Sequence, residues 1–292
     1  MTKYLRQSLD FLIFSNIFIS LGAAAQGLVT YHLLDLKPSG LVLGFLFFST
    51  LLTYNFSILI QKPSEKQKKA YKRVNWIFSH YRLNVSITLI AILALIALFF
   101  LLSFGAQILI VFLGILSIGY ALPLFSVGKR RFGLRNIPGL KLFLIALVWA
   151  LSSVVLPVIE YQKNHVSIVS HQDLIILLAK RFLFIVAITI PFDIRDMFQD
   201  KSYNLKTIPT VFGEKNAYLF CQMMLVSSLG LLFLFRGNGF NADFFALAIT
   251  IILTGWLIFK SKWEKNEYYY FFFLDGTLIL QFVMLFLFNF IW

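Results

Sequence analysis

The stretch LNVSITLIAILALIALFFLLSFGAQILIVFLGILSIGYAL, at residues 83–122, contains no charged residue. A helix needs about 20 apolar residues to cross the hydrocarbon core of a bilayer, so this stretch is long enough to cross twice. Gly105 lies near its middle, where we expect a tight turn, because glycine adopts the backbone conformations that turns require. The stretch therefore predicts a transmembrane helical hairpin.

The rest of the sequence has the same apolar character. The 292 residues are 59% hydrophobic and 13% charged, and the mean hydropathy is +0.82. Transmembrane β-strands would alternate polar and apolar residues, and the sequence does not, so we expect an all-α polytopic helical bundle forming a single domain over residues 1–292. Nine runs are expected to cross the membrane, at about residues 9–30, 40–60, 83–103, 105–126, 138–158, 173–192, 216–235, 243–260 and 269–291.

The basic residues lie in short tracts between the apolar runs. The net charge is +13, but these residues do not interleave with aromatics on a polar surface, which argues against nucleic-acid binding. Cytoplasmic loops are enriched in lysine and arginine, and a cytoplasmic N-terminus places 21 of the 26 basic residues on the inner side. The first run is too long for a cleavable signal peptide. We therefore expect a multi-pass protein of the cell (inner) membrane with its N-terminus inside.

An acidic cluster lies at the cytoplasmic end of the sixth run, in PFDIRDMFQD at residues 191–200. On a helix, Asp193, Asp196 and Asp200 share one face, where like charges repel one another unless a cation compensates them. Mg²⁺ prefers oxygen ligands and is often held by one or two carboxylates together with phosphate oxygens. Two interpretations stay open: a metal–diphosphate site, or surface carboxylates that pair with nearby basic residues.

The segment DIRDMFQDKSYNLKTIPTVFGEKNA, at residues 193–217, extends this pattern. After the aspartates it contains a Thr-x-Pro at Thr207 and Pro209 and a glycine at Gly213. The segment resembles the second aspartate-rich motif of the UbiA superfamily of intramembrane prenyltransferases, with Asn204 in place of a turn glycine. The segment GYALPLFSVGKRRFGLRNIPGLK, which begins at Gly119, is similar to the Tyr-x-x-Pro and basic segment of that superfamily.

The first aspartate-rich motif of the superfamily is degenerate in this sequence. The corresponding segment, TYNFSILIQKP at residues 53–63, retains Asn55 but has Phe56, Leu59 and Pro63 in place of the three acids. A second metal ion cannot be held there by carboxylates. The chain is similar in this respect to a divergent bacterial subgroup of the superfamily.

The resemblance implies a transferase that moves a polyprenyl group from its diphosphate to an aromatic or lipid acceptor in the bilayer, assisted by Mg²⁺. Asp193, Asp196 and Asp200 would bind the metal and serve catalysis. The expected substrate-binding residues are Asn55, Lys62, Tyr120, Lys129, Arg130 and Arg181. Basic residues, among them Arg131, would neutralise diphosphate charge in place of the missing metal.

The roles of the charged residues within the apolar runs stay open, and so do two rival functions. Arg181 would contact an acceptor headgroup or, if its run is shifted, extend with Lys180 to the outer interface. Asp275 would pair with a base or a substrate hydroxyl.

The loss of the first motif also fits a non-catalytic lipid-binding or assembly protein. A secondary transporter fits less well, because its charges would lie at the membrane midplane.

Overall fold

The computed structural model of the chain describes residues 3–61, 63, 71–121, 125–127, 130–132, 139–163, 169–198, 206–237, 239–264 and 266–291. In these ranges, seven helices are long and apolar enough to cross a membrane, and the bent pair Tyr4–Phe14 and Ile17–Leu33 makes an eighth if it is counted as one span. The shorter apolar helix Phe104–Tyr120 occupies the place of the remaining predicted run. The prediction of an all-α membrane bundle with about nine transmembrane helices is confirmed.

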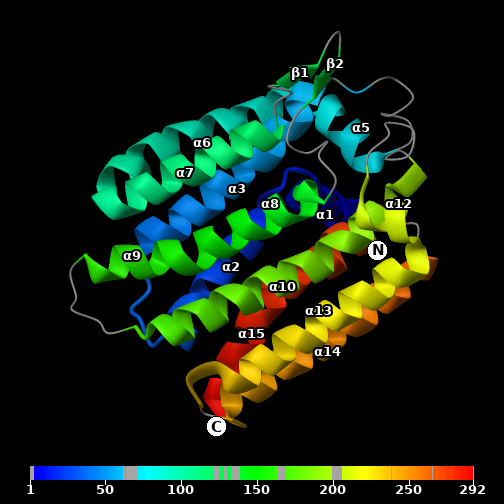
Figure 1. The fold of residues 1–292 in the computed structure, drawn as a ribbon. Helices are drawn as coiled ribbons and strands as arrows, with labels where there is room; N and C mark the ends of the chain where they lie inside the picture. Colours follow the sequence, from blue (N-terminus) through cyan, green and yellow to red (C-terminus); the bar gives the residue numbers. More distant parts are fainter. Residues whose placement is uncertain are drawn as a thin grey trace.

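The crossing helices lie side by side in one bundle (Figure 1). In chain order they are α1 (Lys3–Phe14) with α2 (Ile17–Leu33), α3 (Gly40–Gln61), α6 (Tyr81–Leu101), α7 (Phe104–Ala121), α8 (Leu140–Ala150) continued by the π-helix η2 (Leu151–Val155) and α9 (Leu156–Gln162), α10 (His171–Arg195), α13 (Glu214–Leu234), α14 (Ala242–Lys260), and the π-helix η5 (Tyr269–Leu274) continued by α15 (Asp275–Ile291). Two short 3₁₀ turns, η3 (Phe235–Gly237) and η4 (Ser261–Trp263), follow α13 and α14.

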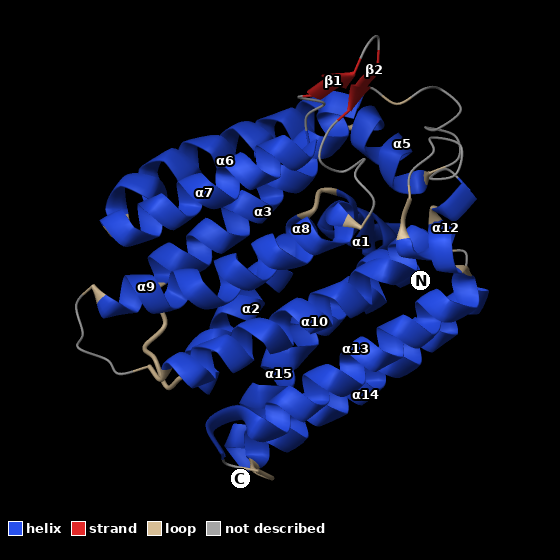
Figure 2. Cartoon of the chain, in the orientation of Figure 1, coloured by secondary structure: helices blue, strands red, loops and turns tan. Residues whose placement is uncertain are grey.

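Three short elements lie at one end of the bundle, which we call the capped end. They are α5 (Lys72–Ser79) after α3, a hairpin after α7, and α12 (Ile208–Phe212) after α10. The hairpin pairs β1 (Phe125–Val127) antiparallel with β2 (Arg130–Phe132). Figures 1 and 2 show all three at the same end.

Helix α10 runs through the middle of the bundle, where it packs mainly against α8 and α13. Its side chains Leu177, Phe184 and Ile190 are buried in the core. Close packing between α2 and α3 depends on Gly27, where a Cβ atom would lie 2.7 Å from Leu46 Cδ1. Small residues let membrane helices approach closely enough for dispersion contacts to stabilise the bundle.

The first crossing is bent by 61° between α1 and α2. Asn16 lies at the break with φ 68° and ψ 9°, a left-handed conformation that asparagine adopts more readily than most residues. The bend places the buried Asn16 side chain against α3, where its Nδ2 donates a hydrogen bond to Asn55 Oδ1 over 2.6 Å. The break therefore connects α2 to the remnant of the first motif.

The predicted hairpin between the third and fourth runs is confirmed, but the expected role of Gly105 is wrong. The chain turns at Leu102 and Ser103, and the Ser103 amide donates a hydrogen bond to Glu160 Oε2 over 2.7 Å. Gly105 already lies within α7, where a Cβ atom would come 3.2 Å from Ile159 Cγ2. The glycine permits close packing of α7 on α9 instead of forming the turn.

Candidate functional site

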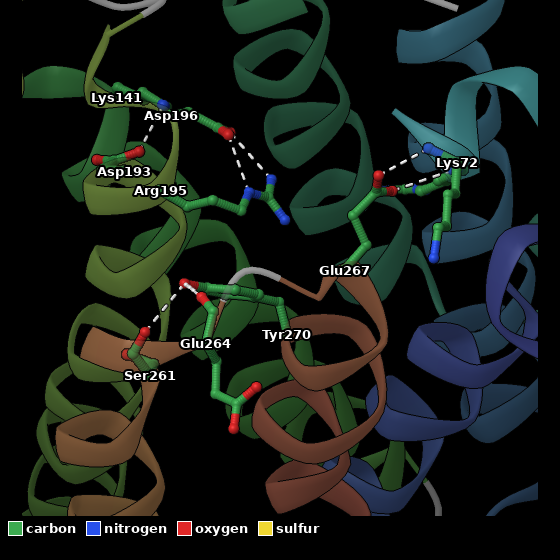
Figure 3. A network of polar contacts seen from close by, with 10 residues as sticks. Lys72, Lys141, Asp193, Arg195, Asp196, Ser261, Glu264, Glu267 and Tyr270 are labelled. Atoms are coloured by element: carbon green, nitrogen blue, oxygen red, sulfur yellow. Dashed lines mark hydrogen bonds and ion pairs between the residues drawn. The ribbon is translucent and has the colours of Figure 1, made fainter. Parts of the chain in front are cut away.

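The end of α10 carries two of the three predicted aspartates. Asp193 lies in its last turn and is 3% exposed, and Asp196 follows the helix directly. Lys141 Nζ of α8 donates a hydrogen bond to Asp193 Oδ1 over 2.6 Å. Arg195 donates to both oxygens of Asp196, from Nε over 2.9 Å and from Nη2 over 3.0 Å (Figure 3). Each carboxylate is therefore already paired with a cation.

The Arg195 guanidinium lies among aromatic rings from two elements. Its Cζ is 5.3 Å from the ring centroid of Phe192 and 5.0 Å and 5.3 Å from those of Tyr270 and Phe271. Such contacts attract a cation to the faces of the rings. Among the described residues, the buried Nη1 atom of Arg195 has no hydrogen-bond partner. Buried donors are nearly always satisfied, so this atom is available to a ligand.

A second arginine reaches the same place from α5. Glu267 holds the first turn of α5, because its carboxylate accepts hydrogen bonds from the Lys72 amide over 2.7 Å and the Arg73 amide over 3.0 Å (Figure 3). A carboxylate is favourable at a helix N-terminus. The Arg73 guanidinium lies 4.5 Å from the centroid of Phe271, and burial lowers its pKa. Its buried Nε atom is also without a partner among the described residues.

Arg73 is connected to the remnant of the first motif through Asn16. Arg73 Nη2 donates to Asn16 Oδ1, and Asn16 Nδ2 donates to Asn55 Oδ1. Phe56, at the position of the first missing acid, is 38% exposed. The end of α3 therefore keeps the asparagine of the superfamily pattern, now linked to a guanidinium, and lacks the three acids that accompany it in that pattern.

Two cavities adjoin these side chains. The polar cavity, of about 180 Å³, is lined among others by Arg73, Lys141, Asp193, Arg195, Asp196 and Asp275. The apolar cavity, of about 400 Å³, lies between α3, α6, α7, α8 and η2. Tyr54 of α3 and Trp149 of α8 line both cavities, and we call these two side chains the aromatic neck. A molecule with a charged head and a long apolar tail matches this pair of spaces.

The donor set of the described residues fits one Mg²⁺ ion at the end of α10, whereas α3 itself contains no carboxylate. Asp193 and Asp196 face one cavity and are hard oxygen donors, which suits a cation that also binds phosphate oxygens. Across the described residues, no three His, Cys, Asp or Glu side chains gather closely enough to hold a metal ion by themselves. Substrate oxygens would therefore have to complete the coordination.

Other predicted residues are placed differently or lie outside the described residues. Tyr120, in the last turn of α7, lies near enough to Tyr54 for electrostatic interaction but does not line either cavity. Asp200, Lys62, Lys129 and Asn204 lie outside the described residues, and Arg130 and Arg131 are described only as backbone in β2. Their roles at the site stay predictions.

Arg181 lies in the core and lines neither cavity. Its side chain is 1% exposed and donates to Gln26 O over 3.0 Å, Ser153 Oγ over 3.1 Å and Thr30 Oγ1 over 3.4 Å. The alternative that it extends with Lys180 to the outer interface is wrong, because both side chains are buried. These contacts join α10 to α2 and η2, which favours a packing role over acceptor binding.

The Thr-x-Pro and the glycine that follow the acidic cluster build α12. Thr207 begins this helix in a capping box, with its amide donating to Thr210 Oγ1 over 2.7 Å. Pro209 occupies the first turn, where a missing amide proton costs nothing. Gly213, with φ 83°, separates α12 from α13 in a conformation that favours glycine. The motif therefore shapes the chain beside the site.

Several cavity residues were not predicted as site residues from the sequence, among them Tyr54, Arg73, Lys141, Trp149 and Arg195. The sequence places Arg73 and Arg195 only among the basic residues of the inner side. Lys141 ends the segment that resembles the basic motif of the superfamily, and this was the available signal. Tyr54 directly precedes Asn55 and carried no signal beyond that neighbourhood.

Comparisons with known proteins agree with this arrangement. A sequence profile described as the UbiA prenyltransferase family matches residues 80–277. A structure of a UbiA homolog from Archaeoglobus fulgidus bound to DMAPP and Mg²⁺ is similar, with a TM-score of 0.59 and 14% identity over 97% of this chain and 99% of that one. An apo UbiA homolog from Aeropyrum pernix K1 has a TM-score of 0.58 and 14% identity, with 96% of each chain covered.

A structure of digeranylgeranylglyceryl phosphate synthase has a TM-score of 0.54 and 17% identity over 96% of this chain and 97% of that one. At these identities the structural likeness shows the fold alone. A comparison with functionally curated proteins gave no match. The sequence profile covers more than half of the residues, and the chain belongs to the UbiA prenyltransferase family.

Proposed function

We propose that this chain transfers a polyprenyl group from its diphosphate to a membrane-soluble acceptor, with one divalent cation bound on one side of the diphosphate and arginine on the other. The observation that carries this proposal is that the polar cavity, lined by three basic and three acidic side chains, and the apolar cavity share the lining residues Tyr54 and Trp149. A polyprenyl diphosphate has the matching shape and polarity. Related structures contain DMAPP or GPP together with Mg²⁺.

The residues at the end of α10 would exchange partners when the substrate binds. In the structure, Lys141 pairs with Asp193 and Arg195 with Asp196. A diphosphate attracts both cations, and the two carboxylates are then free to bind Mg²⁺. When bound, Mg²⁺ supplies positive charge that favours departure of the diphosphate. The pre-formed pairs keep the polar cavity close to electrical balance before the ligands arrive.

Arg73 and Arg195 would bind the diphosphate directly. Each has a buried nitrogen without a partner among the described residues, and both guanidinium groups line the polar cavity. Phe271, which contacts both guanidinium groups, restricts their orientation. Hydrogen bonds from fixed donors stabilise the charge that develops on a leaving group.

The aromatic neck would protect the carbocation that forms when the diphosphate leaves. Tyr54 and Trp149 line both cavities. Aromatic faces attract cations, and an apolar cavity excludes water that would quench the cation. By the distribution of basic residues, the capped end and this site would face the cytoplasm.

A test is binding of radiolabelled geranylgeranyl diphosphate to the purified protein in detergent, with Mg²⁺ or with EDTA. We expect Mg²⁺-dependent binding that is lost in Asp196→Asn. Asp173→Asn is the matched control, because Asp173 lies on the same helix in its first turn. Binding that is unchanged by EDTA and by Asp196→Asn would contradict the metal site.

A second candidate, a non-catalytic lipid-binding or assembly protein, is favoured by the ion pairs that already engage both aspartates. It predicts that polyprenyl diphosphate binds without Mg²⁺. It also predicts that no diphosphate is released when wild-type protein is supplied with membrane extracts as a source of acceptors.

A further inference from the structure

Asp275 introduces a carboxylate into a membrane-spanning segment. It is the first residue of α15, within the candidate span Tyr269–Phe290. Phe271, Asp275 and Leu278 all line the polar cavity, as the spacing of one helix face requires. An acidic side chain inside a membrane is costly, so it is retained where it faces a cavity, a partner or a substrate.

Asp275 differs from the other carboxylates of the polar cavity because it is not engaged. Asp193 and Asp196 each form an ion pair. No hydrogen bond or ion pair joins Asp275 to another residue in the described part of the chain. The cations Arg73 and Arg195 interact with it through space, but their hydrogen bonds go to Asn16 and Asp196.

The position of Asp275 relative to the neck defines what it would face. The prenyl carbon that carries the diphosphate must lie between the cations of the polar cavity and the apolar cavity. Tyr54 and Trp149 line both cavities, and Tyr54 also lies within electrostatic reach of Asp275. An acceptor that attacks this carbon therefore approaches within the space that Asp275 borders.

We propose that Asp275 binds a neutral hydroxyl group of the acceptor and takes up the proton that the acceptor loses. This inference rests on the proposed prenyl transfer. The bond from the first prenyl carbon to the bridging oxygen breaks, and diphosphate leaves with the electron pair. The acceptor oxygen, or a ring carbon beside its hydroxyl, forms the new bond to that carbon. The acceptor proton passes to the Asp275 carboxylate, so atoms and charge balance.

The charge of Asp275 also restricts the class of acceptor. A carboxylate or phosphate next to the attacking atom would meet a like charge in a partly desolvated cavity, and such juxtaposition opposes binding. The basic groups of the cavity would already be engaged by the diphosphate. The acceptor is therefore a phenol, hydroquinone or alcohol that has no anionic group beside its reactive position.

Two probes that differ in one carboxylate test this inference: 1,4-dihydroxynaphthalene and 1,4-dihydroxy-2-naphthoate. Each is titrated into purified protein loaded with Mg²⁺ and geranylgeranyl S-thiolodiphosphate, a donor whose sulfur bridge resists ionisation. Wild-type protein should bind the neutral ring at least about tenfold more tightly than the carboxylate. Asp275→Asn should lose this preference while its affinity for the donor stays within about twofold.

Turnover with geranylgeranyl diphosphate provides a second readout. Asp275→Asn should slow transfer to the neutral ring by about 100-fold or more, as expected when a proton acceptor is removed. Asp275→Glu should restore part of the rate, and Asp173→Asn should match the wild type. If Asp275 served only as a structural counter-ion to Arg73 and Arg195, Asp275→Asn would instead alter the affinity for the donor. The preference between the two rings would then stay unchanged.

The inference is overturned if the wild type binds both rings equally, prefers the carboxylate or binds neither, or if Asp275→Asn keeps the wild-type preference and rate. Failure of the donor to bind wild-type protein is a different result. It would remove the proposed function itself, and the role of Asp275 with it.

Discussion

The ends of α10 and α3 both border the polar cavity region, but they carry opposite kinds of groups. The end of α10 presents Asp193 and Asp196, each paired with a cation. The end of α3 presents Asn55, linked through Asn16 to Arg73. A diphosphate can be neutralised by metal ions or by guanidinium groups. This difference is the basis of our proposal that the chain would use a metal ion on one side of the cavity and arginine on the other.

The largest effect is expected from the end of α10. Asp196→Asn replaces a charged carboxylate ligand with a neutral amide and leaves Arg195 without its anionic partner, so transfer should fall about 100- to 1,000-fold. The measurement is release of radiolabelled diphosphate in the presence of Mg²⁺. Asp173→Asn serves as the control on the same helix. Full activity of the Asp196→Asn variant would contradict metal binding by Asp196.

Arg73→Ala, which changes the side of the cavity at the end of α3, should have the next largest effect. Loss of a charged hydrogen-bond donor should weaken binding of geranylgeranyl diphosphate about 10- to 100-fold. Arg73→Lys should recover only part, because ammonium cannot reproduce the planar contact with Phe271. Arg236→Ala, a partly exposed arginine paired with Asp35, is the control. Equal affinity of the Arg73 and Arg236 variants would show that arginine does not replace the missing metal.

A smaller effect is expected from Glu267→Gln, which acts through the position of Arg73. The substitution weakens the carboxylate contact with the first turn of α5, a contact of about 0.5–2 kcal/mol. Donor affinity should fall by about three- to tenfold, as read from the same binding assay. When Glu267→Gln is combined with Arg73→Ala, it should cause no further loss of donor affinity. A full additional loss of affinity in the double variant would contradict a role of Glu267 that acts through Arg73.

The smallest effect on binding is expected from Arg181→Met. This side chain lines neither cavity, and methionine fills a similar volume without a buried charge. Donor affinity and transfer should stay within about twofold of the wild type, whereas the unfolding midpoint reports any packing change. A selective loss of transfer would restore the prediction that Arg181 contacts the acceptor.

Most of the fold could be predicted because apolar runs of about 20 residues leave little choice of structure in a bilayer. The details that depend on single contacts could not. The bend at Asn16 requires a left-handed residue, and no spacing rule marks it. Gly105 was assigned to a turn because glycine is common there, whereas close packing against Ile159 explains it.

The candidate site was predicted on the side where its residues are close in sequence. Asp193 and Asp196 lie three positions apart, so a helix places them together. Arg73 was missed because its partners are distant: Asn16 lies in the first crossing, and Glu267 lies near the last. Long-range pairs of this kind follow from the packing of the bundle and leave no local pattern in the sequence.

The number of metal ions bound with the donor tests the central claim most directly. Mn²⁺ can replace Mg²⁺, and electron paramagnetic resonance counts the ions that bind to purified protein when geranylgeranyl S-thiolodiphosphate is added. The account predicts one donor-dependent Mn²⁺ per chain, absent in Asp196→Asn and still present in Arg73→Ala at saturating donor. Two donor-dependent ions per chain, or none, would contradict a site with metal on one side and arginine on the other.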